Sequence, residues 1–394
     1  MAYKKRQEIS VDELNDMQRY LGEETIENYQ AGQMSRRRML RRLVLICGAP
    51  GAAALLIACG DATATQPAPT VAPTTAPAAT TAAATTTAPT TAAATSAAAT
   101  TTAATSAAST TSAATTAAQT TAAGTTAPGT TAAGTTAAGT TTAAGTTAAG
   151  ATAGASRSPL SVAANDPAVV ATDVTYPGDT TIMGYLVKPA ASGTYPGVIV
   201  IHENRGLTDH IKDVARRFAK AGYIALAPDL ASRNGGTAKI PEDQVTGYFA
   251  NAKPEDLVKD LNSTETYLET VSGVKAGKYG VVGFCFGGGY TLRFAAANPR
   301  VAAAVPYYGP VPSPVSQMAS TQAAILGIYG GNDTRVNSGI PDLESTLKNA
   351  GKTFEKIVYD GANHAFNNDT GANYNENASN MAWTATLDWL KKYL

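Results

Sequence analysis

The sequence is poor in cysteine and histidine, with three residues of each among 394. Cys47 and Cys59 lie near the N-terminus, so Cys285 is the single thiol of residues 158–394, and a disulfide framework is excluded there. No two histidines have the spacing of a metal-binding pair, and no glycine-rich phosphate-binding or dinucleotide-binding motif occurs. We therefore expect no metal and no cofactor.

The chain also lacks net charge, because 30 basic residues balance 30 acidic ones. A neutral protein gives no reason to expect a nucleic acid as partner. Residues 62–157 hold almost only alanine and threonine with scattered proline, glycine and serine, and residues 62–156 contain neither charge nor aromatic ring. Such a segment has too little apolar surface to offset the entropy of ordering. We predict a disordered linker here, with a composition suited to O-glycosylation.

Residues 1–61 have the features of an export leader. Residues 1–34 are polar without a clear apolar face, and residues 35–42 (SRRRMLRR) contain paired arginines similar to a twin-arginine signal. The apolar run 43–58 follows, interrupted by glycine and proline, and is short for a membrane span. Its end, LIAC at 56–59, resembles a bacterial lipobox. We expect export and a lipid anchor on Cys59 that holds the protein at the membrane; the alternative is a signal anchor that is never cleaved.

Residues 158–394 have the composition of one globular domain, in which apolar runs alternate with amphipathic segments. The alternation predicts an α/β fold with a doubly wound, mostly parallel sheet and helices on both faces. The active site is then expected at the carboxyl ends of the strands. We predict strands at 170–176, 180–188, 197–202, 223–227, 278–282, 301–306, 324–329 and 354–359, and helices at 209–221, from 254, at 288–297 and at 378–393.

The pentapeptide GFCFG at 283–287 stands between a predicted strand and a predicted helix. It has the G-x-C-x-G pattern of a nucleophile elbow, with Cys285 where serine is usual. The helix that follows would direct backbone N–H groups toward the sulfur atom. Without further machinery, Cys285 would be an inert thiol in a glycine-rich turn.

A cysteine nucleophile requires a base and an orienting acid. Asp333 and His364 each come directly after a predicted strand, and the order Cys285, Asp333, His364 is that of the α/β-hydrolase triad. We expect the N–H groups of Phe286 and Asn204 to form the oxyanion hole. Two further histidines have a simpler interpretation: His202 is structural at a strand end, and His210 is solvent-exposed in a helix.

Four stretches together resemble the dienelactone hydrolase (carboxymethylenebutenolidase) family: HENRG at 202–206, APDL at 227–230, GFCFGG at 283–288 and NHAF at 363–366. The resemblance spans about 165–394 and implies an α/β-hydrolase that opens lactones through a Cys-His-Asp triad. It also implies that Glu203 keeps the resting thiol neutral and helps to form the thiolate when substrate binds. It implies that Arg233 binds a substrate carboxylate. A second family arginine, four residues after the histidine, is here Asn368.

The sequence thus predicts a cell-surface hydrolase, expected to be monomeric, that acts on a small lactone or activated ester. Because Asn368 replaces an arginine, a broad-specificity carboxylesterase is an alternative. A non-catalytic surface binding protein on the same fold is another.

Overall fold

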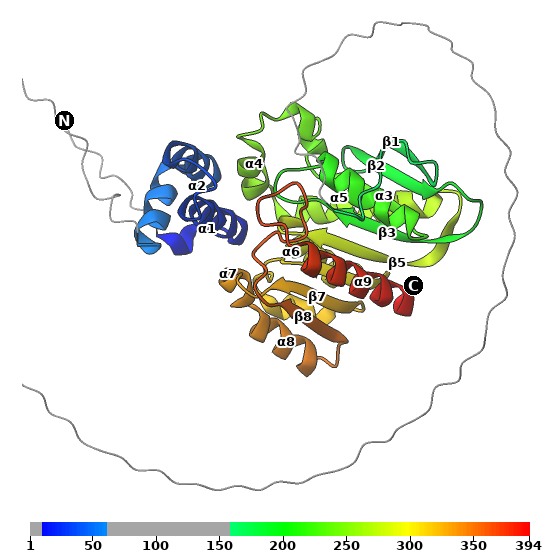
Figure 1. Ribbon diagram of the computed structural model, residues 1–394. Helices are drawn as coiled ribbons and strands as arrows, with labels where there is room; N and C mark the ends of the chain where they lie inside the picture. Colours follow the sequence, from blue (N-terminus) through cyan, green and yellow to red (C-terminus); the bar gives the residue numbers. More distant parts are fainter. Residues whose placement is uncertain (1–9, 61–157) are drawn as a thin grey trace, which may run out of the picture. The chain divides into compact units, whose positions relative to one another are not determined.

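The computed structural model describes residues 10–60 and 158–394, which fall in one compact unit. The predicted linker, 62–157, lies outside the described residues. The centre of residues 158–394, the predicted catalytic domain, is an eight-stranded sheet with the order β1-β2-β4-β3-β5-β6-β7-β8 (Figure 1). Strands β1 and β2 are antiparallel to their neighbours and the others are parallel. The strands are β1 Val169–Pro177, β2 Thr181–Pro189, β3 Tyr195–Ile201, β4 Ile224–Asp229, β5 Val274–Phe284, β6 Val301–Tyr307, β7 Ala324–Gly330 and β8 Phe354–Tyr359.

The central strands are largely apolar, and the sheet buries them on both faces. Every residue of β4 and β7 is buried, as are the last five of β3 and the last six of β5. Strands covered on both sides read as continuous apolar runs, and these runs made the strands recognisable in the sequence. All eight predicted strands are present, with bounds that differ mainly at their ends.

Helices cover both faces of the sheet. Within β5, a Cβ on Gly280 would contact Leu390 of α9, whereas one on Gly283 would meet Thr291 of α6. Residues an odd number of positions apart point to opposite faces of a strand, so α9 and α6 lie on opposite sides. The predicted α/β-hydrolase architecture is confirmed. The helices of this domain are α3 Asp209–Lys220, α4 Val245–Asn251, α5 Pro254–Thr270, α6 Phe286–Ala297, α7 Thr334–Asn337, α8 Ile340–Asn349 and α9 Glu376–Tyr393.

The described part of the predicted leader, residues 10–60, contains a short 3-10 helix, Val11–Glu13, and the α-helices α1 Asp16–Gln30 and α2 Arg36–Ala58, of which α2 is kinked at Gly48. The expectation that residues 1–34 have no apolar face is wrong. Met17, Tyr20 and Leu21 share one face of α1 and are at most 6% exposed. Both α-helices pack against α4 of the catalytic domain. The length and composition of α2 are also those of a membrane-spanning helix, but signal sequences and buried core helices share these properties.

Candidate active site

The nucleophile elbow has the geometry that the sequence predicts. Strand β5 ends at Phe284, α6 begins at Phe286, and Cys285 between them has φ 55° and ψ −119°. This backbone conformation is unfavourable for a residue with a side chain and is characteristic of functional sites. A Cβ on Gly283 would collide with the carbonyl oxygen of Gly287, and a Cβ on Gly287 would collide with that of His202. The flanking glycines therefore allow the tight approach that the turn requires.

The base and its orienting acid lie at the same edge of the sheet. Asp333 follows β7 as the N-cap of α7, and His364 lies in the loop after β8. The Nδ1 atom of His364 is 2.6 Å from Oδ2 of Asp333, and Oδ1 of Asp333 accepts a hydrogen bond from the Val336 N–H. A ring nitrogen of His364 and the Cys285 Sγ atom lie within 4.8 Å of one another. The structure thus brings together the three residues predicted as a triad.

Electrostatic interactions shift the pKa values of this group in a consistent way. Burial opposes a charge on His364, but Asp333 and Cys285 raise its pKa well above the usual value. Burial also opposes a charge on Asp333 and so raises its pKa, but the favourable interactions, led by those with His364, outweigh burial, and the pKa of the carboxyl is lowered. Burial, and then the carboxylates of Glu24 and Glu203, raise the pKa of the Cys285 thiol, while His364 lowers it. The net direction of these shifts favours a protonated resting thiol, the state that the family resemblance implies.

Both residues predicted to form the oxyanion hole lie beside the nucleophile. Phe286 is the first residue of α6, so its N–H has no acceptor within the helix and lies at the positive end of the helix dipole. Asn204 follows β3 and lines the same cavity as Cys285. The Asn204 side chain is engaged elsewhere, since Nδ2 donates to the carboxylate of Glu24.

Glu203 is buried beside the nucleophile and is held by one side chain. Its Oε2 atom accepts a hydrogen bond of 2.7 Å from Nδ2 of Asn368, while Oε1 is buried without a partner among residues 10–60 and 158–394. Both side chains line the cavity that contains Cys285. The residue that replaces the family's second arginine therefore contacts the active-site carboxylate itself.

Arg233 does not take the predicted position. Its Nε and Nη2 atoms donate to the two carboxylate oxygens of Asp260 at 2.9 and 2.8 Å, and it is absent from the cavity wall. Asp260 lies on α5, whose approach to this turn could not be inferred from the local sequence. The expectation that Arg233 reads a substrate carboxylate is not supported by these contacts. The catalytic-domain guanidinium that lines the cavity is that of Arg205, which is exposed.

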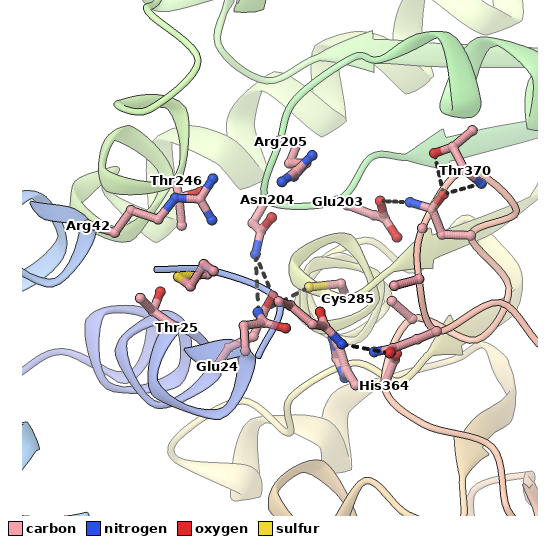
Figure 2. A pocket seen from close by; sticks show the side chains of 18 of the residues that line it. Glu24, Thr25, Arg42, Glu203, Asn204, Arg205, Thr246, Cys285, His364 and Thr370 are labelled. Atoms are coloured by element: carbon pink, nitrogen blue, oxygen red, sulfur yellow. Dashed lines mark hydrogen bonds between the residues drawn. The ribbon is translucent and has the colours of Figure 1, made fainter. Parts of the chain in front are cut away.

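The cavity has a volume of about 520 Å³, and leader and catalytic domain both contribute to its wall (Figure 2). From the leader, Glu24 lies beside Cys285 and Asn204, and Arg42 lines the cavity next to Thr246. Sequence reasoning missed this contribution, because the leader was interpreted only as an export signal. Glu24, Cys285 and His364 also have ligand atoms close enough to hold an ion such as Zn²⁺. However, the Tyr20 hydroxyl already contacts two of these three side chains, because it lies 3.4 Å from Sγ of Cys285 and 3.4 Å from Nε2 of His364.

The two other histidines are both structural. His202 is buried, with Nδ1 2.7 Å from the Glu203 carbonyl oxygen and Nε2 accepting from the Leu230 N–H. His210 is buried as well, which corrects the expectation of an exposed side chain. Its Nδ1 lies 2.8 Å from Oδ1 of Asp369, and Arg217 donates to Oδ2 of the same carboxylate.

The comparisons agree with this geometry. The sequence profile described as "Dienelactone hydrolase family" matches residues 182–394, more than half of the chain. The chain belongs to the dienelactone hydrolase family. Two similar proteins are each named "Putative carboxymethylenebutenolidase". That of Methylorubrum extorquens is 32% identical over 59% of this chain and 84% of its own length. That of Escherichia coli K12 is 34% identical over 60% and 93%.

Solved structures give the same result for the fold. A "Putative Dienelactone Hydrolase" from Klebsiella pneumoniae is 31% identical with a TM-score of 0.54, and the similarity covers 57% of this chain and 100% of that one. The residues that the family profile matches, 182–394, lie within the catalytic domain. This member of the dienelactone hydrolase family is accordingly a hydrolase.

Proposed function

We propose that the protein hydrolyses a lactone or activated ester at the cell surface, with Cys285 as nucleophile, His364 as base and Asp333 as its orienting acid. The observation that carries the proposal is the His364–Asp333 contact of 2.6 Å beside a cysteine in the strained elbow conformation. Family membership supports the hydrolase class, and the names of the relatives support the lactone.

The proposed reaction starts from the protonated thiol. Glu203 takes up the thiol proton as Sγ attacks the substrate carbonyl carbon and returns it when the thiol is released; His364, whose pKa is raised, already carries a proton. The Phe286 and Asn204 N–H groups hold the oxyanion, each such donor being worth about 3 kcal/mol. Collapse of the tetrahedral intermediate breaks the bond to the leaving oxygen, which takes the proton from His364. Water, deprotonated by His364, then hydrolyses the thioester and releases the acid and the thiol.

Two features favour the alternative of a broad carboxylesterase. Asn368 occupies the position of a family arginine, and Arg233 is bound to Asp260. Both positions that the resemblance assigns to carboxylate binding are thus engaged elsewhere, which favours neutral esters or substrates with one acidic group. The third reading, a non-catalytic binding protein, is favoured by no contact of this site.

The test uses the isolated domain 158–394, since its relatives stand alone, together with the full chain. Neutral aryl esters and enol lactones are offered as substrates, and intact mass is followed for an acyl adduct. We expect turnover and, with slowly hydrolysed esters, an adduct on Cys285 that Cys285→Ala abolishes. Turnover retained above about a tenth of the wild-type rate in Cys285→Ala would exclude covalent catalysis by this thiol.

Export and lipidation at Cys59 remain part of the proposal. Cys59 is exposed at the C-terminus of α2, and its accessibility supports modification or cleavage there. Replacement Cys59→Ser should release the domain from membranes or stop processing. Identical fractionation of mutant and wild type would contradict the anchor.

A further inference from the structure

We infer that the N-terminal helices α1 and α2 are an intramolecular inhibitor that occupies the active site until the leader is removed. The partner of the surface around Cys285 is thus a segment of the same chain. The inference rests on the proposed function in one respect only, because it takes Cys285 and His364 as the catalytic pair.

The Tyr20 side chain occupies space that a substrate needs. Its hydroxyl lies 3.4 Å from Sγ of Cys285 and 3.4 Å from Nε2 of His364, and the residue is 6% exposed. During acyl transfer the substrate carbonyl carbon must approach Sγ, and the leaving oxygen must come within about 3 Å of the base. One atom in contact with both groups therefore excludes the reacting part of any ester.

Glu24, one turn further along α1, occupies the neighbouring space. Its carboxylate accepts hydrogen bonds of 3.0 and 3.2 Å from Nδ2 of Asn204, and Oε2 lies 3.5 Å from Sγ of Cys285. A carboxylate so close to a thiol opposes formation of the thiolate. Glu24 raises the pKa of Cys285, second in effect only to burial. The leader therefore excludes substrate and also keeps the nucleophile in its unreactive form.

Contacts on several sides hold α1 over the site. The guanidinium of Arg335, on α7, lies 4.3 Å from the Tyr20 ring centroid, and its Nε donates to Glu27 at 2.9 Å. Further hydrogen bonds tie the leader to four other places in the catalytic domain. They are Asp16 to Arg293 on α6 at 3.0 Å, Gln18 to Asn251 at the end of α4 at 2.9 Å, Gln33 to Asn373 before α9 at 2.8 Å, and Arg41 to Asp243 before α4 at 3.1 Å.

The docked leader buries much of the apolar run 43–58 but leaves the first arginines and the cysteine of the proposed export signal accessible. Arg36 and Arg37 are exposed, and so is Cys59, whereas Tyr20 is buried. A translocation machinery could thus read the arginines while the catalytic site is covered. Cleavage before Cys59 would remove α1 and α2 together. The fold thereby links activation of the hydrolase to its export.

The test measures access to the thiol, which requires no ester turnover. N-ethylmaleimide modification of Cys285 is timed by peptide mass spectrometry in the full chain and in domain 158–394. We expect the full chain to react at least about tenfold more slowly, as when a cover is open in under a tenth of molecules. Tyr20→Ala in the full chain should restore most of the domain's rate. The matched control Tyr29→Ala, on the same helix, should not.

Two further variants separate the roles of the two leader side chains. Tyr20→Phe keeps the ring under Arg335, so the thiol should stay protected even without the hydroxyl. Glu24→Gln should move the pH profile of modification to lower pH, since a charge that raises the thiol pKa is removed. Equal rates in full chain and domain, or a Tyr20→Ala variant as slow as wild type, would overturn the inference. A protected thiol in a protein whose free domain hydrolyses no ester would instead overturn the proposed function alone.

Discussion

The Asn368 amide donates a hydrogen bond of 2.7 Å to Oε2 of Glu203. Its orientation is fixed from the other end, because Oδ1 accepts from both the N–H and the hydroxyl of Thr370, at 3.1 and 2.7 Å. Asn368 therefore holds the active-site carboxylate in place, and its own amide is engaged at both ends. An arginine introduced here would pair with Glu203 before it could read a substrate carboxylate.

Replacement of Asn368 by aspartate should make stability depend on pH near this site. The introduced carboxyl group and that of Glu203 would then face each other, and because two negative charges at this distance repel, one of the two groups must take up a proton. A carboxyl whose pKa is raised on folding contributes stability that is lost as pH rises. We expect Asn368→Asp to be destabilised more at pH 8 than at pH 5, measured by urea unfolding. Asn368→Leu, which adds no charge, should show an equal loss at both pH values.

Asp333→Asn should weaken both catalysis and a pH-dependent part of stability. The amide cannot support the imidazolium, so we expect kcat to fall about 10³–10⁴-fold, with little change in KM. The stability of the pair depends on an ionised Asp333 and a protonated His364. Because the Asp333 pKa is lowered, the stability that this group contributes is fully present above its usual pKa of 3.8. Because the His364 pKa is raised, the stability that this group contributes is fully present below its usual pKa of 6.5.

The stability deficit of Asp333→Asn should therefore be largest between those two pH values. It should shrink at higher pH, as His364 loses its proton in the wild type. Urea unfolding of both proteins from pH 4 to pH 9 measures this difference. A deficit that stays constant over the range would mean that the contact does not include a protonated imidazole.

The sequence predicted what depends on local pattern. The central strands contain apolar runs, and the elbow, Asp333 and His364 each follow a strand, so the fold and the meeting of these three residues at one sheet edge could be predicted. The missed features depend on partners distant in sequence. Asp260, 27 residues after Arg233, and Asp369, 159 residues after His210, have no local signal that would reveal these pairs. The spacing of Met17, Tyr20 and Leu21 did carry a helical signal, but it was masked by the charged residues around it.

Arg233→Ala should affect stability and leave substrate preference unchanged. The guanidinium is the partner of Asp260, whose side chain is 1% exposed, and a buried charge without its partner is costly. Because Arg233 is partly exposed and water can replace it in part, we expect a loss of about 1–3 kcal/mol in the free energy of unfolding. Arg233→Ala combined with Asp260→Asn should recover part of that loss, as measured by urea unfolding. Unchanged stability in the single variant would show that the pair contributes nothing.

Arg205 is the residue that we expect to distinguish acidic from neutral substrates. It lines the cavity beside Asn204, and no ion pair engages it within the described parts of the chain. A guanidinium can bind a carboxylate at two points, and a charged hydrogen bond contributes about 1.5–3 kcal/mol. Arg205→Gln in the domain 158–394 should therefore lower kcat/KM for acidic esters about 10–100-fold and leave matched neutral esters almost unchanged.

The control for this prediction is Arg233→Gln, which changes a second arginine outside the cavity. Its ratio of acidic to neutral kcat/KM should equal that of the wild type. Equal losses on both substrate types in Arg205→Gln would mean that Arg205 shapes the cavity and does not read charge. A selective loss in Arg233→Gln would mean that Arg233 leaves Asp260 when an acidic substrate binds, and would restore the role that the family resemblance implies.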